Sequence, residues 1–354
     1  MKIEYIFVAF ALLGIIDCII GKRMKLGDEF EKGINMMSPL VIPMAGMLIL
    51  APVIAEVFSA LLIPVVTALG MDISVVGTFF PNDAGGAAIA YELSDNTVIR
   101  GFNGIVVASM FGANVTLIPL SLKLIEEKYH DDVLSGLLCG LATIPVGCIV
   151  SGFIVGMTFM QIVLNILPSV VLSIFICIGL VKAPQLIKKI LEAVGKLIFV
   201  FMLFGLGVGI LHKLTGFELI PGIASIDESF LIIGNIAIIL AGVFPLLAVI
   251  SRVLKKVFIS FGRLIKINDT SVLGLVTNLA NSIPVFSMMN DMDKRGRIFN
   301  MAFAVSAGYA FGDHLAFTLS YDGVFAMPMV VGKLISGVSA IALAAIVCRK
   351  EMKK

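Results

Sequence analysis

Two apolar segments of equal length stand out: SVVGTFFPNDAGGAAIAYEL (residues 74–93) and SVLGLVTNLANSIPVFSMMN (residues 271–290). Each is about as long as the roughly 20 residues that a helix needs to cross a bilayer. Polar and helix-breaking residues interrupt both, Asn82-Asp83-Ala84-Gly85-Gly86 in the first and Asn281-Ser282-Ile283-Pro284 in the second. Broken membrane helices at corresponding places in two halves of a chain are typical of transporter binding sites.

The similarity of the two segments extends beyond the breaks at a fixed spacing of 197 residues. The pairs that keep this spacing are Asp72 and Asp269, Arg100 and Arg297, Phe102 and Phe299, Asn103 and Asn300, Ser109 and Ser306, and Gly140 and Gly337. Chance similarity between apolar helices is the alternative, but polar identities held in register favour a duplication. We therefore expect membrane repeat one at 1–156, a connecting helix and loop at 157–192, membrane repeat two at 193–348 and a basic tail at 349–354.

The composition predicts a membrane protein. The 354 residues are 59% hydrophobic and 14% charged, whereas a soluble domain carries about 25% charged residues. The apolar runs long enough for membrane segments are 4–20, 34–56, 74–93, 97–120, 133–156, 158–181, 193–212, 229–251, 271–290, 297–319 and 325–348. We expect an all-α polytopic membrane protein of about 9–11 membrane segments, some of which do not cross completely.

Several classes of function have no support in the sequence. The net charge of +2 is small and gives no indication of a nucleic-acid partner. The five cysteines lie in or beside apolar runs without metal-ligand spacing, and three histidines are too few for a His-rich site. We expect no metal, no cofactor and no catalytic residue.

Basic residues in the loops predict the orientation of the segments. The segment 271–290 has basic residues on both sides, in the amphipathic stretch 252–267 and at Lys294 and Arg295. Both of its ends are then cytoplasmic, which makes it a re-entrant or broken segment. The corresponding stretch 57–71 has no Lys or Arg and is expected outside. The two repeats are then inverted, and the basic tail is cytoplasmic.

Asp83 is the strongest candidate for a functional residue. A carboxylate inside a membrane segment costs several kcal/mol unless it is paired or hydrated, so such residues are functional by default. Gly85 and Gly86 allow a chain break and a close approach of the backbone. We expect a cation-binding carboxylate in a cavity; the alternative is a structural carboxylate bonded to backbone amides at the break.

Other polar residues in the membrane segments have less certain roles. Asp313-His314 is expected near the end of segment 297–319, either as a gate or proton relay or as a solvated pair. Lys333 is expected to be structural. Asn103, Asn300, Ser109 and Ser306 could line a site or join helices by hydrogen bonds. Any cation–π contact must use Phe79, Phe80, Tyr309 or Phe311, because the chain has no Trp.

Long sequence blocks resemble the EutH-type ethanolamine-utilisation membrane proteins. In the second half these are residues 278–289 (NLANSIPVFSMM), 292–296 (MDKRG), 303–307 (FAVSA), 312–315 (GDHL) and 328–335 (PMVVGKLI). In the first half they include 51–53 (APV), Asp83-x-Gly85-Gly86 and 143–149 (TIPVGCI). The resemblance implies an ethanolamine permease or facilitator of the bacterial cytoplasmic membrane, from an operon that feeds ethanolamine to an ammonia-lyase.

The site expected for ethanolamine combines one charge with neutral polar groups. A protonated amino alcohol needs acceptors for its ammonium and mixed partners for its hydroxyl. Asp83 is the expected counter-charge, and the substrate-binding residues are expected to be Asn82, Asp83, Gly85, Gly86, Asn278, Asn281 and Ser282. Transport would proceed by facilitated diffusion or by alternating access, with ethanolamine and the lipid bilayer as partners; a homo-oligomer is left open.

Two other functions are weighed against ethanolamine transport. One is an ion-coupled secondary transporter of another small polar metabolite. The other, more distant, is an intramembrane aspartyl protease that would use Asp83 and Asp313. Its G-x-G-D signature requires glycine where Ala310 stands, and no Tyr precedes Asp83.

Overall fold

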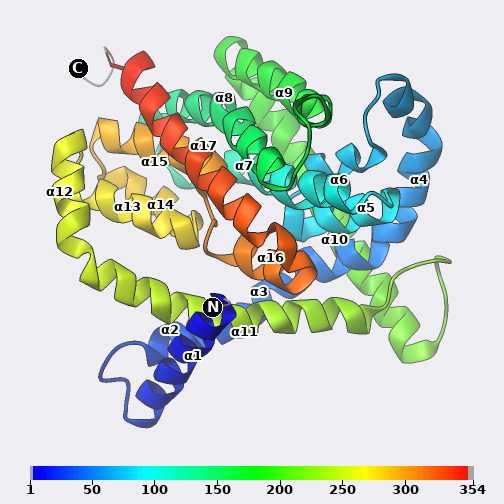
Figure 1. Cartoon of the computed structure of the whole chain (residues 1–354), viewed down its shortest axis with the longest axis horizontal. Coiled ribbons are helices and arrows are strands. Elements are labelled where there is room, and N and C mark those ends of the chain that lie inside the picture. Colours follow the sequence, from blue (N-terminus) through cyan, green and yellow to red (C-terminus); the bar gives the residue numbers. More distant parts are fainter. Residues whose placement is uncertain (1–2, 350–354) are drawn as a thin grey trace.

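The computed structural model describes residues 3–349, and this range contains helices and turns but no strand (Figure 1). Figure 1 shows α11 along the lower edge of the molecule, with α1 and α2 packed against it. The helices are α1 (Ile3–Ile19), α2 (Gly27–Asn35), α3 (Met37–Leu40), α4 (Gly46–Ala68), α5 (Ala87–Leu93), α6 (Thr97–Gly101), α7 (Asn114–Leu124), α8 (His130–Ile154), α9 (Phe159–Lys182), α10 (Pro184–Thr215), α11 (Ile226–Val253), α12 (Lys255–Ile265), α13 (Asp269–Ala280), α14 (Ile283–Met288), α15 (Lys294–Ala307), α16 (Asp313–Asp322) and α17 (Ala326–Val347).

The all-α polytopic fold class is confirmed. Seven continuous helical stretches within residues 3–349 are long and apolar enough to cross a membrane: Gly27–Ala68, Thr97–Leu124, Glu127–Ile154, Phe159–Lys182, Pro184–Thr215, Ile226–Val253 and Asp313–Val347. Large apolar side chains on α9 and α10, among them Phe175 and Val181, point away from the protein. A surface of this kind is stable in contact with lipid, because a bilayer interior solvates it.

Both predicted breaks are present. In the first segment a 3-10 helix (Ile73–Phe79) gives way to extended backbone at Phe80 and Pro81, and α5 starts only at Ala87. Gly85 has φ 109°, a left-handed conformation that glycine adopts without strain. In the second segment α13 ends at Ala280, Asn281 is extended and α14 begins at Ile283.

The expectation of one unbroken segment at 297–319 is wrong. The chain leaves the helix after Ala307 and resumes it at Asp313. Between them the N–H groups of Tyr309 and Phe311 donate to the carbonyls of Asn278 and Leu279, at 2.8 Å each. These carbonyls belong to the last turn of α13, where the break leaves helix carbonyls without their usual partners. The break after Ala307 is therefore joined by backbone hydrogen bonds to the break after Ala280.

The two amphipathic stretches differ from each other. Most of 252–267 forms a short helix of its own, α12, whereas most of 57–71 continues α4 without interruption to Ala68. The end expected for the membrane segment 34–56 is therefore not the end of a helix. The basic tail expected at 349–354 lies outside the described residues, apart from Arg349.

The first helix of each predicted repeat packs against the other repeat. Gly242 of α11 lies against the backbone of Phe7 in α1, and Gly46, at the start of α4, lies against the backbone of Met202 in α10. A side chain at either glycine would collide with that backbone. Because only glycine permits this approach, both crossings depend on the two glycine positions.

Some hydrogen bonds recur at the 197-residue spacing. The amide of Asn103 donates to the hydroxyl of Ser74 at 3.0 Å, and the amide of Asn300 donates to the carbonyl of Ser271 at 2.9 Å. Asn96 caps the N–H of Ile99, and Asp293 likewise caps the N–H of Gly296. The division into repeats and their inverted orientation remain predictions.

Candidate functional site

The first break faces the beginning of α16. Residues Asn82–Gly86 contact α16, whose first two residues are Asp313 and His314. The carboxylates of Asp83 and Asp313 lie close enough to interact electrostatically with each other and with the ammonium of Lys333 in α17. Three ionisable groups from three segments thus form one cluster, and His314, whose Nδ1 lies 3.1 Å from Nζ of Lys333, is its fourth member. We call Asp83, Asp313, His314 and Lys333 the charged cluster.

The backbone of the break holds Asp83 in place. The carbonyl of Pro81 accepts the N–H groups of Ala84 at 3.1 Å and Gly86 at 2.9 Å, which closes the turn. The N–H groups of Asp83 and Ala84 then face the Asp83 carboxylate. Gly86 lies so close to the carbonyls of Phe80 and Gly77 that a side chain would collide with them. The two glycines therefore shape the turn that presents Asp83.

Two polar side chains at the breaks are completely buried without a protein partner. Neither the amide nitrogen nor the carbonyl oxygen of Asn82 has a hydrogen bond to the described residues, and the same is true of the Ser282 hydroxyl. A buried polar group left without a partner costs about 1–3 kcal/mol. Such groups are accordingly available to a ligand that enters the site.

Lys333 is held by two neighbours. Its ammonium donates to the carbonyl of Ser109 at 2.7 Å and meets Nδ1 of His314 at 3.1 Å. Ser109 lies in a π-helical segment, Phe102–Gly112, and such segments are frequent at functional sites. With a protonated lysine beside it, Nδ1 of His314 must be the acceptor, so the imidazole is neutral with its proton on Nε2.

Tyr309 connects the second break to the charged cluster. Its hydroxyl interacts with the backbone N–H of Ser282 and lies within electrostatic reach of Asp83 and Asp313. Its ring packs on the His314 imidazole with centroids 5.2 Å apart. Tyr309 has φ 62°, rare for a residue with a side chain, and this conformation belongs to the break between α15 and α16. The sequence indicated Tyr309 only as an aromatic side chain available to a cation.

Most of the other predicted site residues bind to protein instead. Asn278 donates to Asn300, at 3.3 Å to both its backbone and side-chain oxygens, and the carboxamide oxygen of Asn281 caps the N–H of Ile283 at 2.8 Å. Asn103 also donates to Asn165 at 2.9 Å. The Ser109 hydroxyl donates to the carbonyl of Val106, while the buried Ser306 hydroxyl has no partner among the described residues. Most of these amides join helices. Asn82, Asp83 and Ser282 remain available at the breaks, together with the side-chain oxygen of Asn278, which has no partner among the described residues.

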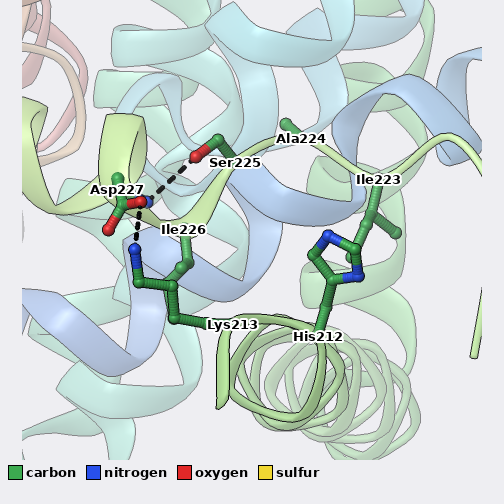
Figure 2. A pocket seen from close by; sticks show the side chains of 7 residues that line it. All are labelled: His212, Lys213, Ile223, Ala224, Ser225, Ile226 and Asp227. Carbon is green, nitrogen blue, oxygen red and sulfur yellow. Dashed lines mark hydrogen bonds and ion pairs between the residues drawn. The ribbon is translucent and has the colours of Figure 1, made fainter. Parts of the chain in front are cut away.

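A surface pocket lies elsewhere, where α10 leads into α11 (Figure 2). It has a volume of about 340 Å³ and is lined by His212, Lys213, Ile223, Ala224, Ser225, Ile226 and Asp227. Figure 2 shows the ion pair between Lys213 and Asp227, with 2.6 Å between Nζ and Oδ2. Both side chains are more than half exposed, so the pair is solvated and none of the predicted site residues takes part.

No metal-binding arrangement is found in the part of the chain that the structure describes. Within residues 3–349, no group of three or more His, Cys, Asp or Glu side chains is placed to hold an ion. None of the five cysteines, all within the described range, forms a disulfide. The polar groups at the two breaks and at the start of α16 are instead carboxylates, which accept hydrogen bonds, and an amide and hydroxyls, which both donate and accept them.

Comparisons with known proteins agree with the sequence blocks. The family model described as "Ethanolamine utilisation protein, EutH" matches residues 2–347. A protein of Listeria monocytogenes named "Probable ethanolamine permease EutH" is 40% identical over 99% of this chain and 95% of its own length. A protein of the same name from Escherichia coli is 33% identical over 99% of this chain and 95% of its own length. The protein "Uncharacterized protein YxeR" of Bacillus subtilis is 35% identical over 97% of this chain and 93% of its own length. No solved structure shows a significant match. This multi-pass helical membrane protein belongs to the EutH family of ethanolamine utilisation proteins.

Proposed function

We propose that this protein transports ethanolamine into the cell as the protonated cation. The relatives from Listeria monocytogenes and Escherichia coli are named as probable ethanolamine permeases and match almost the full chain. Neutral ethanolamine crosses lipid unaided, whereas the ammonium form carries a charge that hydrocarbon excludes. A carrier is thus needed for the form that dominates at neutral and acid pH.

The observation that carries the proposal is the pair of breaks connected through Tyr309. Asp83 supplies the counter-charge for the ammonium, and the unpartnered groups of Asn82 and Ser282 supply donors and acceptors for the hydroxyl. In this proposal Asn281 and Asn278 maintain the shape of the second break. Gly85 and Gly86 maintain that of the first. The sequence leaves open a gate or proton relay and a solvated pair for Asp313 and His314, and in this proposal both residues belong to the binding site itself.

Alternating access through inverted repeats is the mechanism we propose. Two contacts support the predicted orientation. Arg252, at the end of α11, donates to the carbonyls of Met24 and Lys25 in the loop 22–33, whose basic residues also predict a cytoplasmic side. The hydroxyl of Tyr91 in α5 donates to Asp322 at the end of α16 at 2.7 Å, and the predicted orientation puts both of these helix ends outside. Each broken segment would then enter from a different side, with its break near the middle of the membrane.

Asp83→Asn tests the proposal directly. Uptake of labelled ethanolamine into proteoliposomes at acid pH should fall to the level of protein-free vesicles, because the amide cannot balance the ammonium charge. Asp95→Asn is the matched control, since Asp95 is exposed just beyond the same segment and should transport normally. Gel filtration and thermal unfolding in detergent should show that both variants are folded. Unchanged uptake by Asp83→Asn would remove Asp83 from the site.

Ion coupling is tested by imposed gradients. Facilitated diffusion requires ethanolamine to equilibrate at the same rate with or without a proton or sodium gradient across the vesicle membrane. Accumulation driven by either gradient would instead favour the ion-coupled transporter and would direct attention to Asp313 and His314 as the coupling groups.

A further inference from the structure

Lys333 is one of the most deeply buried ionisable groups of the described chain. Its side chain is 1% exposed and lies on α17, where Gly332 allows the helix to approach Gly147 of α8. The hydroxyl of Ser151 donates to the carbonyl of Pro328 at 2.8 Å, and that of Ser336 donates to the carbonyl of Thr143 at 2.9 Å. These bonds fix the rotation of α17 and hence the direction of the lysine.

The lysine ammonium is near both carboxylates without forming a contact ion pair. Asp83 and Asp313 interact with it electrostatically, yet no carboxylate oxygen in residues 3–349 lies within 4.0 Å of Nζ. Ser109 and His314 accept two of its three protons. The charge is thereby held at a fixed place beside the carboxylates without taking up their oxygens. Oδ1 of Asp313 accepts the backbone N–H of His314 at 3.0 Å, and each carboxylate can accept further donors.

A count of charges shows what this arrangement does to the site. The groups that face one another are Asp83, Asp313, Lys333, the neutral His314, Tyr309 and the thiol of Cys148. With both carboxylates and the lysine ionised, the cluster carries one net negative charge. One monovalent cation brings it to zero, whereas two cations or one dication would leave an uncompensated positive charge in a buried site.

We propose that Lys333 is a built-in second ammonium that restricts the site to a single monovalent organic cation. The two carboxylates alone would accept a diamine, and the tethered lysine already occupies one of the two cation positions. This inference rests on the proposed function, because it specifies the charge of the substrate that binds beside Asp83. It makes Lys333 a residue that determines specificity, where a purely structural lysine would only stabilise α17.

The first test uses 1,2-diaminoethane, which is ethanolamine with its hydroxyl replaced by a second amine. At acid pH both of its amines are protonated. It should compete poorly with labelled ethanolamine in the wild type but well in Lys333→Met, where its inhibitory concentration relative to unlabelled ethanolamine should fall about 10-fold or more. Lys196→Met, at an exposed position on α10 outside the charged cluster, is the control and should keep the wild-type ratio. An unchanged ratio in a folded, active Lys333→Met would overturn the inference.

The second test restores the charge balance. Asp313→Asn alone should lose ethanolamine uptake about 10-fold or more, because the cluster then carries no net charge. Adding Lys333→Met should recover uptake, since the net charge returns to minus one. If Lys333 were purely structural, the double variant should take up less ethanolamine than either single variant. That result would overturn the inference.

A third measurement needs no variant and applies even if Lys333→Met does not fold. At acid pH, ethanolamine should raise the unfolding temperature of the wild-type protein in detergent, and 1,2-diaminoethane at the same concentration should not. Equal protection by the diamine would contradict the inference while leaving transport intact. Absence of both uptake and protection by ethanolamine would instead refute the proposed function itself.

Discussion

Nε of Arg297 donates to Oδ2 of Asp132 at 2.8 Å, which connects α15 to the beginning of α8. Only about 10% of either side chain is exposed, and the guanidinium lies 3.8 Å from the centre of the Tyr129 ring. Arg100, which precedes Arg297 by 197 residues, also stacks on a tyrosine, Tyr91, at 4.5 Å. The two arginines therefore anchor equivalent helix ends in a similar manner.

Removing one partner of the buried pair should be costly. Asp132→Asn should lower the free energy of unfolding by about 3–5 kcal/mol, because Arg297 is left buried without a counter-charge. Asp227→Asn, which breaks the exposed pair with Lys213, should change it by less than about 1 kcal/mol. Thermal and denaturant unfolding in detergent would measure both. Equal destabilisation by the two substitutions would show that burial of the Arg297–Asp132 pair does not increase its contribution to the free energy of unfolding.

The orientation of the repeats can be read from two exposed positions. Asp95 and Asp291 follow the two broken segments, and the inverted arrangement places them on opposite sides of the membrane. In a cysteine-free background, Asp95→Cys should react with an impermeant maleimide from outside intact cells. Asp291→Cys should react only after the cells are opened. Labelling of both from the same side would exclude inverted repeats.

The conformation of the first break should matter for transport. Gly85→Ala introduces a side chain at φ 109° that also meets Met47, and should cost about 1–2 kcal/mol in the folded state. Because the turn presents Asp83, ethanolamine uptake should fall more steeply than stability does. Gly207→Ala, with nothing close to its added methyl group, is the comparison and should remain active. If uptake fell equally in both variants, the conformation of the turn at Gly85 would have no particular role in transport.

Recognition of the hydroxyl should depend on Asn82. Ethylamine has the ammonium but no hydroxyl, and a site that must leave buried polar groups unpaired discriminates against such an analogue. In Asn82→Leu the preference for ethanolamine over ethylamine should fall about 10-fold or more, measured by competition for uptake. Asn235→Leu, at an exposed position on α11, should keep the wild-type preference. A preference unchanged in Asn82→Leu would assign recognition of the substrate hydroxyl to other groups, of which the unpartnered hydroxyl of Ser282 is one.

The sequence predicts what is local in this fold. Pro284 removes a helix donor, and the pair Gly85-Gly86 allows a turn, so both breaks can be located without coordinates. The break after Ala307 could not be, because Gly308 and Gly312 are ordinary residues in membrane helices. Its cause is the pairing of Tyr309 and Phe311 with carbonyls of α13, a contact between segments that only the folded chain makes.

The charged cluster also depends on contacts between segments that the sequence does not predict. Asp83, Asp313 and Lys333 are each conspicuous as ionisable residues in apolar runs. Whether they face one another depends on the rotation of α17, which the approach of Gly332 to Gly147 determines. Spacing along the chain says nothing about this, and Lys333 was accordingly expected to be structural. For Asn103 and Asn300 the sequence leaves open a place in the site and a role between helices, and their hydrogen bonds show that they join helices.

The first helix of each predicted repeat packs against the other repeat, and this packing limits how the protein can move. Since α1 is locked against α11 at Gly242, and α10 against α4 at Gly46, neither half is a separate block. Separating the halves would break both helix contacts. Expressing one half alone would leave two helices without the helices against which they pack. In the proposed alternating-access mechanism, the boundary between the moving part and the stationary part would therefore pass through each predicted repeat, and both repeats would contribute helices to the part that carries substrate.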